Sequence, residues 1–234
     1  MGLPNGVHHL AIATRDMKAQ LTFFTQVVGM ELEALYWMHG VENTVHAFLR
    51  LGDTCSLSFV QAPDMASIEP VMGVSHPGFS AGSVAPGAMQ HLALSVPSEV
   101  ELLALRDRLR SHGYWVAGPV NHNLCKSMYV QAPEGLVLEF ATEEGAIDTE
   151  QWIDPAVVAF CGISPSELEG FMRPPPFQSQ GGKVSQPPPN TRPNFVFTGE
   201  WAPRGEAFFQ LTDAQIAAAL DSPTPPVPKR RPAP

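Results

Sequence analysis

The stretch Val7-His8-His9-Leu10-Ala11-Ile12-Ala13 returns later in the chain as Met89-Gln90-His91-Leu92-Ala93-Leu94-Ser95. His9 and His91 take the same place in the two copies, 82 residues apart. In each copy larger apolar side chains alternate with small ones, which is the period of a β-strand with one buried face. Both histidines lie on the face of small residues, where a ligand has room. The repetition indicates a duplicated structural unit.

Each copy of this strand is followed by the same series of patterns. Apolar residues recur at helical spacing after Asp16 and again after Ser98, and Gly29 and Gly113 fit the two helix ends. Three more strands are expected after each helix, near residues 31–38, 44–51 and 55–61 and near 114–119, 125–132 and 136–142. The sequence therefore predicts an α+β fold, in which two βαβββ modules form an open, barrel-like mixed sheet with an irregular C-terminal extension.

These patterns divide the chain into five segments. We expect the first module at 1–61, a linker at 62–88, the second module at 89–145, an extension at 146–221 and a disordered Pro-rich tail at 222–234.

The extension is rich in proline but also carries nine large aromatic side chains. Asp154-Pro155 and Thr212 are typical of short helix starts, whereas the proline runs favour extended chain. So many aromatic residues need an apolar surface to cover them. We expect this arm to wrap the module pair or a second subunit, giving a homodimer; the alternative is a local lid without a role in assembly.

Composition excludes several classes of function. The 234-residue chain has a net charge of −9, which argues against a nucleic-acid partner. No apolar run approaches the ~20 residues of a membrane span, and no signal peptide is visible, so we expect no membrane partner. Three cysteines without CxxC spacing favour a reducing compartment, and we expect a cytoplasmic protein.

The strands that close the two modules differ in one important residue. The second ends on Leu138-Glu139-Phe140 where the first ends on Leu57-Ser58-Phe59. His9, His91 and Glu139 thus form a set of two imidazoles and one carboxylate, which is the ligand count of a facial triad for ferrous iron. The sequence predicts a divalent metal at these three residues.

Two βαβββ modules with these histidines and Glu139 resemble the vicinal oxygen chelate superfamily, which includes glyoxalases, bleomycin and fosfomycin resistance proteins and type I extradiol dioxygenases. The resemblance covers roughly residues 6–143. Its sharpest part runs from Val120-Asn121-His122 through Met128-Tyr129 and Ala132-Pro133-Glu134-Gly135 to Glu139, which is similar to the extradiol ring-cleavage pattern with Ala132 in place of the commoner acid.

The resemblance implies a dioxygenase that binds Fe²⁺, with Mn²⁺ or another divalent metal as the alternative, and acts on a small aromatic diol and O₂. Tyr129 shares a strand face with Ser127 and Gln131, so it is a candidate to hydrogen-bond the substrate. His122 and His46 are candidate acid–base residues. The sequence does not decide whether His122, His46 or neither is the acid–base residue.

Two other functions remain open. A glyoxalase or epimerase would use the metal as a Lewis acid, but such sites draw a carboxylate from each module and Ser58 removes one. A binding protein of the bleomycin-resistance kind would hold a small molecule without metal. Fold alone does not choose among these classes.

Overall fold

The computed structural model describes residues 4–143, 145–189 and 195–228. The first module contains β1 (His9–Ala13), α1 (Met17–Thr22), the π-helical turn η1 (Phe23–Val28), β2 (Leu32–Trp37), β3 (Val45–Arg50) and β4 (Ser56–Gln61). Its strands lie in the order β1-β4-β3-β2, with β1 parallel to β4 and the other pairs antiparallel.

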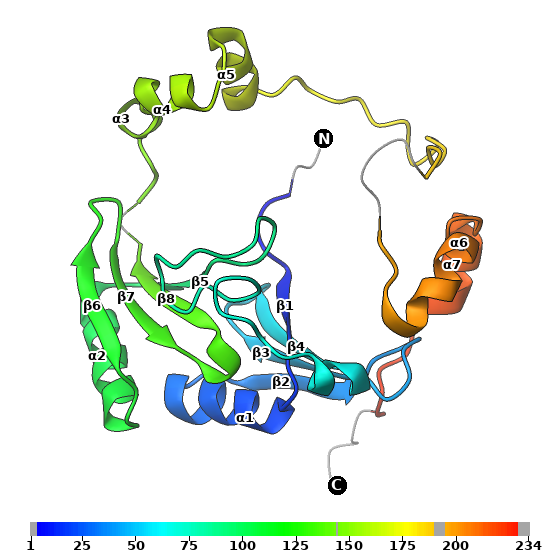
Figure 1. Ribbon diagram of the computed structural model, residues 1–234, viewed down its shortest axis with the longest axis horizontal. Coiled ribbons are helices and arrows are strands. Elements are labelled where there is room, and N and C mark those ends of the chain that lie inside the picture. The colour runs from blue at the N-terminus through cyan, green and yellow to red at the C-terminus, as the bar shows by residue number, and fades with distance from the viewer. Residues whose placement is uncertain (1–3, 144, 190–194, 229–234) are drawn as a thin grey trace, which may run out of the picture.

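The second module repeats this arrangement. It contains β5 (Leu92–Val96), α2 (Glu99–Ser111), β6 (Val116–Asn121), β7 (Lys126–Gln131) and β8 (Val137–Thr142), in the order β5-β8-β7-β6. The α+β fold with paired βαβββ modules is confirmed. The described strands form two separate four-stranded mixed sheets that do not close into a barrel (Figure 1).

Local sequence explains where the module helices begin and end. The Asp16 side chain accepts a 2.9 Å hydrogen bond from the amide of Ala19, and Ser98 caps α2 in the same way. Gly29 ends the first helix with φ 102°, a left-handed conformation that glycine adopts without steric cost. The sequence did not indicate that the last turn before Gly29 is π-helical.

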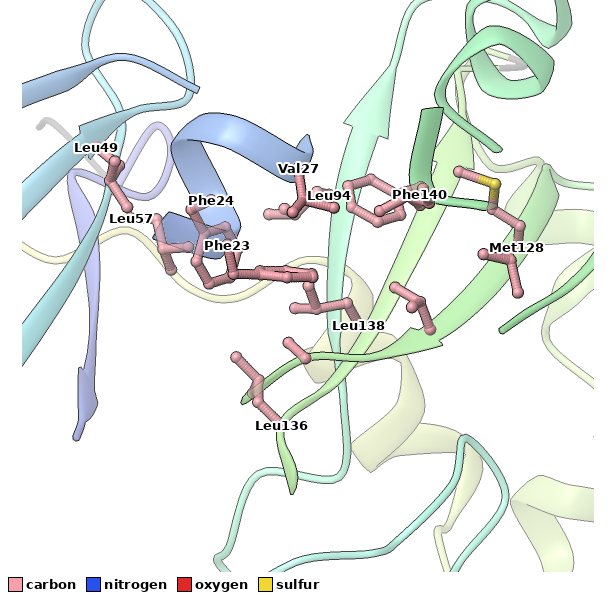
Figure 2. Close-up of a cluster of buried hydrophobic side chains, with 14 of the residues drawn as sticks. Phe23, Phe24, Val27, Leu49, Leu57, Leu94, Met128, Leu136, Leu138 and Phe140 are labelled. Atoms are coloured by element: carbon pink, nitrogen blue, oxygen red, sulfur yellow. The ribbon is translucent and has the colours of Figure 1, made fainter. Parts of the chain in front are cut away.

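The core lies between the helices and the inner faces of the two sheets. Figure 2 shows Phe23 and Phe24 between Leu57 of the first sheet and Leu138 of the second. These four side chains are almost fully buried. One helix therefore contributes apolar surface to both modules, which ties the two halves together.

Polar contacts also join the modules. Arg108 on α2 donates hydrogen bonds of 2.8 and 2.9 Å to the carbonyls of Val27 and Gln26 at the end of the first helix. On the β7–β8 turn, the Glu134 carboxylate accepts hydrogen bonds from Thr14 Oγ1 at 2.6 Å and from the Arg15 amide at 2.8 Å.

The linker between the modules is ordered and lies beside β1 and β8 (Figure 1). It begins with a 3₁₀-helix, η2 (Pro63–Ser67), and is held to the first module by the ion pair between Arg15 and Glu69 at 3.0 Å. The sequence predicted only a connection here.

The extension arches away from both sheets and returns to the first module (Figure 1). It contains α3 (Thr149–Trp152), α4 (Pro155–Phe160), α5 (Pro165–Met172), η4 (Gly199–Arg204), α6 (Gly205–Phe208) and α7 (Asp213–Leu220). The predicted caps at Asp154 and Thr212 are confirmed, whereas α3, α5 and α6 were missed. Ser222 Oγ then lies 3.2 Å from His39 Nε2 on the β2–β3 turn. Residues 229–234 of the predicted disordered tail lie outside the described residues.

No helix in the described part of the chain is long and apolar enough to cross a membrane.

Candidate functional site

The helices pack against one face of each sheet. The opposite face, called the open face below, is exposed along β1 but buried at its centre, where Ser58 and Glu139 are 0% and 7% exposed. Along β1, the exposed residues His9, Ala11 and Ala13 alternate with the half-buried Leu10 and Ile12. The predicted alternation is confirmed, and the open faces carry the side chains that could bind a ligand.

The second module holds a compact polar cluster on its open face. His91 Nε2 lies 2.9 Å from Oε2 of Glu139, a residue that is largely buried at 7% exposure. Tyr129 is the register partner of Glu139 on the neighbouring strand. On the far side, the Tyr129 hydroxyl lies 2.9 Å from Nε2 of His122. Four predicted site residues therefore form a connected chain: His91, Glu139, Tyr129 and His122.

The surroundings of Tyr129 keep its phenol protonated at neutral pH. Burial raises its pKa most, and the negative charge of Glu139 and a hydrogen bond to that carboxylate raise the pKa further, against a smaller opposing effect of Ser127. A protonated phenol is a hydrogen-bond donor, so Tyr129 can donate to an oxygen atom of a ligand.

The first module presents an aromatic surface in the equivalent place. Ser58 pairs with Ala11 as Glu139 pairs with Ala93, so the register confirms that a serine takes the position of the carboxylate. The Ser58 hydroxyl donates to the carbonyl of Leu10 at 3.2 Å. The His9 ring lies 5.3 Å from Phe48, which is the neighbour of Ser58 across β3 and β4.

His46 lies on the same face, 8% exposed. Its Nδ1 is 3.4 Å from the Tyr36 hydroxyl, and its buried Nε2 has no hydrogen-bond partner among the described residues. Burial lowers the pKa of His46, and the nearby His9 lowers the pKa further. His46 is therefore a neutral, incompletely bonded imidazole beside the His9 ring, at a centroid distance of 6.4 Å.

The donor set has the chemistry that a divalent metal requires. Two neutral imidazoles and one carboxylate suit Fe²⁺ or Mn²⁺. His91 and Glu139 are in contact, whereas His9 makes its ring contacts with His8, Phe48 and His46. Among the described residues, no group of three or more His, Cys, Asp and Glu side chains is arranged around a common metal position. Assembly of the complete triad stays a prediction.

A small cavity beside His91 contains residues that the sequence did not single out. It has a volume of about 70 Å³, and its lining includes Gln20, His76, Gln90, His91 and Glu134. Gln20 is 1% exposed and its Oε1 has no partner among the described residues. Gln90 directly precedes the predicted ligand His91, and this position could have indicated it as a site residue. His76 lies in the linker, where no sequence pattern indicated a role.

Comparison with known proteins gives the family. The family model described as "Glyoxalase/Bleomycin resistance protein/Dioxygenase superfamily" matches residues 6–140, which is more than half of the chain. A search of curated proteins finds no match.

Several solved structures are similar to the module pair. A glyoxylase/bleomycin resistance protein/dioxygenase domain from Frankia sp. EAN1pec has 15% identity and a TM-score of 0.48, over 61% of this chain and 100% of its own. The antibiotic binding protein TnmS3 from Streptomyces sp. CB03234 has 19% identity and a TM-score of 0.45, over 62% and 100%. The fosfomycin resistance protein FosX from Mesorhizobium loti has 14% identity and a TM-score of 0.42, over 65% and 100%. At these scores the assignment depends on the family model: the chain belongs to the glyoxalase/bleomycin resistance protein/dioxygenase superfamily, the vicinal oxygen chelate group that its paired modules resemble.

Proposed function

We propose that this protein is a metal-dependent enzyme acting on a small aromatic molecule, and that its reaction is extradiol cleavage of a catechol by O₂. The observation that carries the proposal is the connected chain of His91, Glu139, Tyr129 and His122 on one open face. It combines a metal-type donor pair with a phenol and an imidazole that can hold or move a proton.

Residues His9, His91 and Glu139 would hold the metal, Fe²⁺ in the first place and Mn²⁺ as the alternative. Such a metal, when bound, supplies open positions at which a diol and O₂ can meet. The lone carboxylate of this set leaves a divalent ion with a net positive charge, which favours an anionic oxygen ligand.

The chain's own residues would then orient the substrate and handle its protons. Tyr129 remains protonated, so it can donate a hydrogen bond to a substrate oxygen. His122, which contacts that phenol, can take up or return the proton. Phe48 and Tyr36 have nearly parallel rings, 10° apart, and offer an apolar surface for an aromatic ring.

The serine at position 58 argues against the glyoxalase-type alternative, because it removes the first module's carboxylate from the site. A second candidate is a metal-free protein that binds a small aromatic molecule. The separation of His9 from His91 and Glu139 and its contact with Phe48 favour this reading.

One experiment separates these functions. The full-length protein is reconstituted anaerobically with Fe²⁺, its metal content is measured, and O₂ uptake is followed with a panel of catechols. Metal-dependent O₂ uptake with a ring-cleaved product supports the proposal. Bound metal without O₂ uptake on any catechol contradicts the dioxygenase reading. Tight binding of an aromatic ligand without metal supports the binding protein.

A further inference from the structure

The side chain of Gln90 has a fixed orientation beside His91. Its Nε2 donates hydrogen bonds to two linker carbonyls, of Ser80 at 2.8 Å and of Gly82 at 3.2 Å. Both amide hydrogens are used by these acceptors, so the carboxamide cannot rotate by half a turn without losing two hydrogen bonds. The side-chain oxygen of Gln90 must therefore face away from the linker.

The linker that supplies these carbonyls is itself tightly packed. A Cβ atom on Gly82 would collide with the carbonyl oxygen of Pro77, so only glycine fits at this position. The acceptors of Gln90 thus belong to a well-defined turn.

The oxygen of Gln90 is hydrogen-bonded to Nδ1 of His91. Because an amide oxygen only accepts, His91 must donate, and Nδ1 carries a proton. The other ring nitrogen, Nε2, faces the Glu139 carboxylate at 2.9 Å. Both nitrogens of His91 therefore face acceptors. With Nδ1 protonated, a second proton or a cation is needed between Nε2 and the carboxylate.

The first module has a contact of the same kind. His8 precedes His9 as Gln90 precedes His91, and the Nδ1 atoms of His8 and His9 lie 2.9 Å apart. In both modules the residue before the predicted metal ligand therefore contacts the ligand's Nδ1, so this contact does not use Nε2.

We propose that Gln90 is a positioning residue: held by the linker, it keeps a proton on Nδ1 of His91 and so presents Nε2 to the metal beside Glu139. This inference rests on the proposed metal-dependent function. It also gives the linker a role, since the linker's carbonyls decide which atom of Gln90 meets the histidine. Such outer contacts orient a ligand imidazole and increase its affinity for metal.

The test compares two variants of the full-length protein, one without and one with a hydrogen-bond acceptor at position 90. Gln90→Leu removes the acceptor for Nδ1, whereas Gln90→Glu keeps an acceptor but loses both donors to the linker. Zn²⁺ binding to metal-free protein should weaken by about 10–100-fold in Gln90→Leu, and Gln90→Glu should stay close to wild type. Gln151→Leu, a matched change of an exposed glutamine on α3, should leave the affinity unchanged.

A second readout does not depend on metal. In ¹H–¹⁵N NMR spectra of the metal-free protein, Nδ1 of His91 should carry a proton in the wild type and in Gln90→Glu, and its slowly exchanging signal should disappear in Gln90→Leu. An unprotonated Nδ1 in the wild type would overturn the inference. Equal losses of affinity in both Gln90 variants would also overturn it, because the linker contact rather than the acceptor would then matter. If the wild type binds no Zn²⁺, the proposed function fails while the NMR result still decides the role of Gln90.

Discussion

The hydroxyl of Tyr129 and Nε2 of His122 lie 2.9 Å apart, although His122 precedes the strand that carries Tyr129. A turn between β6 and β7, closed by a 2.9 Å hydrogen bond from the His122 amide to the Cys125 carbonyl, returns the imidazole over the strand. The phenol therefore lies between this imidazole and the Glu139 carboxylate. This relationship makes the pair a single proton-handling unit in the proposed reaction.

The first prediction follows from that unit. Tyr129→Phe should retain bound metal and slow turnover by about 10–1000-fold, because one positioned donor is lost. His122→Ala should have a similar effect, and the double variant should cost little more than either single change if the two act together. Steady-state O₂ uptake measures the turnover rate of each variant, and elemental analysis measures its bound metal. Tyr114→Phe, which alters a phenol packed on Phe23, is the control. An unchanged rate in Tyr129→Phe would reduce Tyr129 to a packing residue.

The second prediction concerns the metal. His9→Ala, His91→Ala and Glu139→Ala should each lose the one divalent ion per chain that we expect in the wild type, since three donors leave no redundancy. Elemental analysis after dialysis against Fe²⁺ measures the stoichiometry. His112→Ala, on an exposed histidine that ends α2, is the control. Wild-type metal content in both His91→Ala and Glu139→Ala would show that the triad is wrong.

The sequence predicted most of the fold because its elements are amphipathic and locally capped. Alternation along β1 and β5 and the caps at Asp16 and Ser98 are local signals, and the structure confirms them. The site was harder to predict because it depends on distances between modules. Strand register shows that Ser58 and Glu139 take equivalent positions in the two sheets. The distance from His9 to His91, in contrast, depends on how the two modules pack together, which the sequence does not reveal. The contact of Gln90 with the linker depends on the positions of the Ser80 and Gly82 carbonyls, which no side-chain pattern reveals.

The third prediction tests the contact between the modules at Glu134. This residue has φ 61°, and its carboxylate also accepts a 2.8 Å hydrogen bond from the buried Gln20. Asparagine tolerates the left-handed conformation, so Glu134→Asn tests the carboxylate rather than the backbone. The free energy of unfolding should fall by about 2–3 kcal/mol, because buried donors of Thr14 and Gln20 lose a charged acceptor.

Urea denaturation measures this change. Glu99→Ala, which removes a surface ion pair with Lys126, is the control and should cost less than about 1 kcal/mol. Equal effects of the two substitutions would mean that Glu134 does not hold the modules together.

The fourth prediction concerns pH and His46. Burial and the neighbouring His9 lower the pKa of His46 in the folded protein. As pH falls below about 6.5, the unfolded chain takes up a proton that folded His46 resists, so this residue makes the protein less stable in acid. His46→Phe removes that penalty. The difference in free energy of unfolding, variant minus wild type, should therefore be more positive at about pH 5 than at about pH 8. Urea denaturation of metal-free protein at both values measures the difference, and parallel pH curves would contradict the assignment.

The last prediction concerns the C-terminal arm, and first its segment from α3 to α5. Several of its large apolar side chains are exposed, including Phe160 at 89% and Phe171 at 65%. The later aromatic residues behave differently: Phe197 lies 5.3 Å from Phe208 and 5.7 Å from Phe209, in a local cluster. Exposed aromatic side chains continue beyond α5 at Phe177 (60%) and Phe195 (72%), but the segment from α3 to α5 is the part that stands away from both sheets (Figure 1). Covering it is worth roughly 1.5–3 kcal/mol for each large side chain.

We predict that a second copy of the chain covers this segment in a homodimer with twofold symmetry. Truncation after residue 148 should abolish the dimer or cause aggregation, as measured by light scattering during size-exclusion chromatography. Phe160→Ser with Phe171→Ser should weaken the dimer while leaving the arm in place. Val100→Ser, at a 77% exposed position on α2, should not. A truncated protein that stays soluble, monodisperse, active and in the same oligomeric state would show that the arm is a local element without a role in assembly.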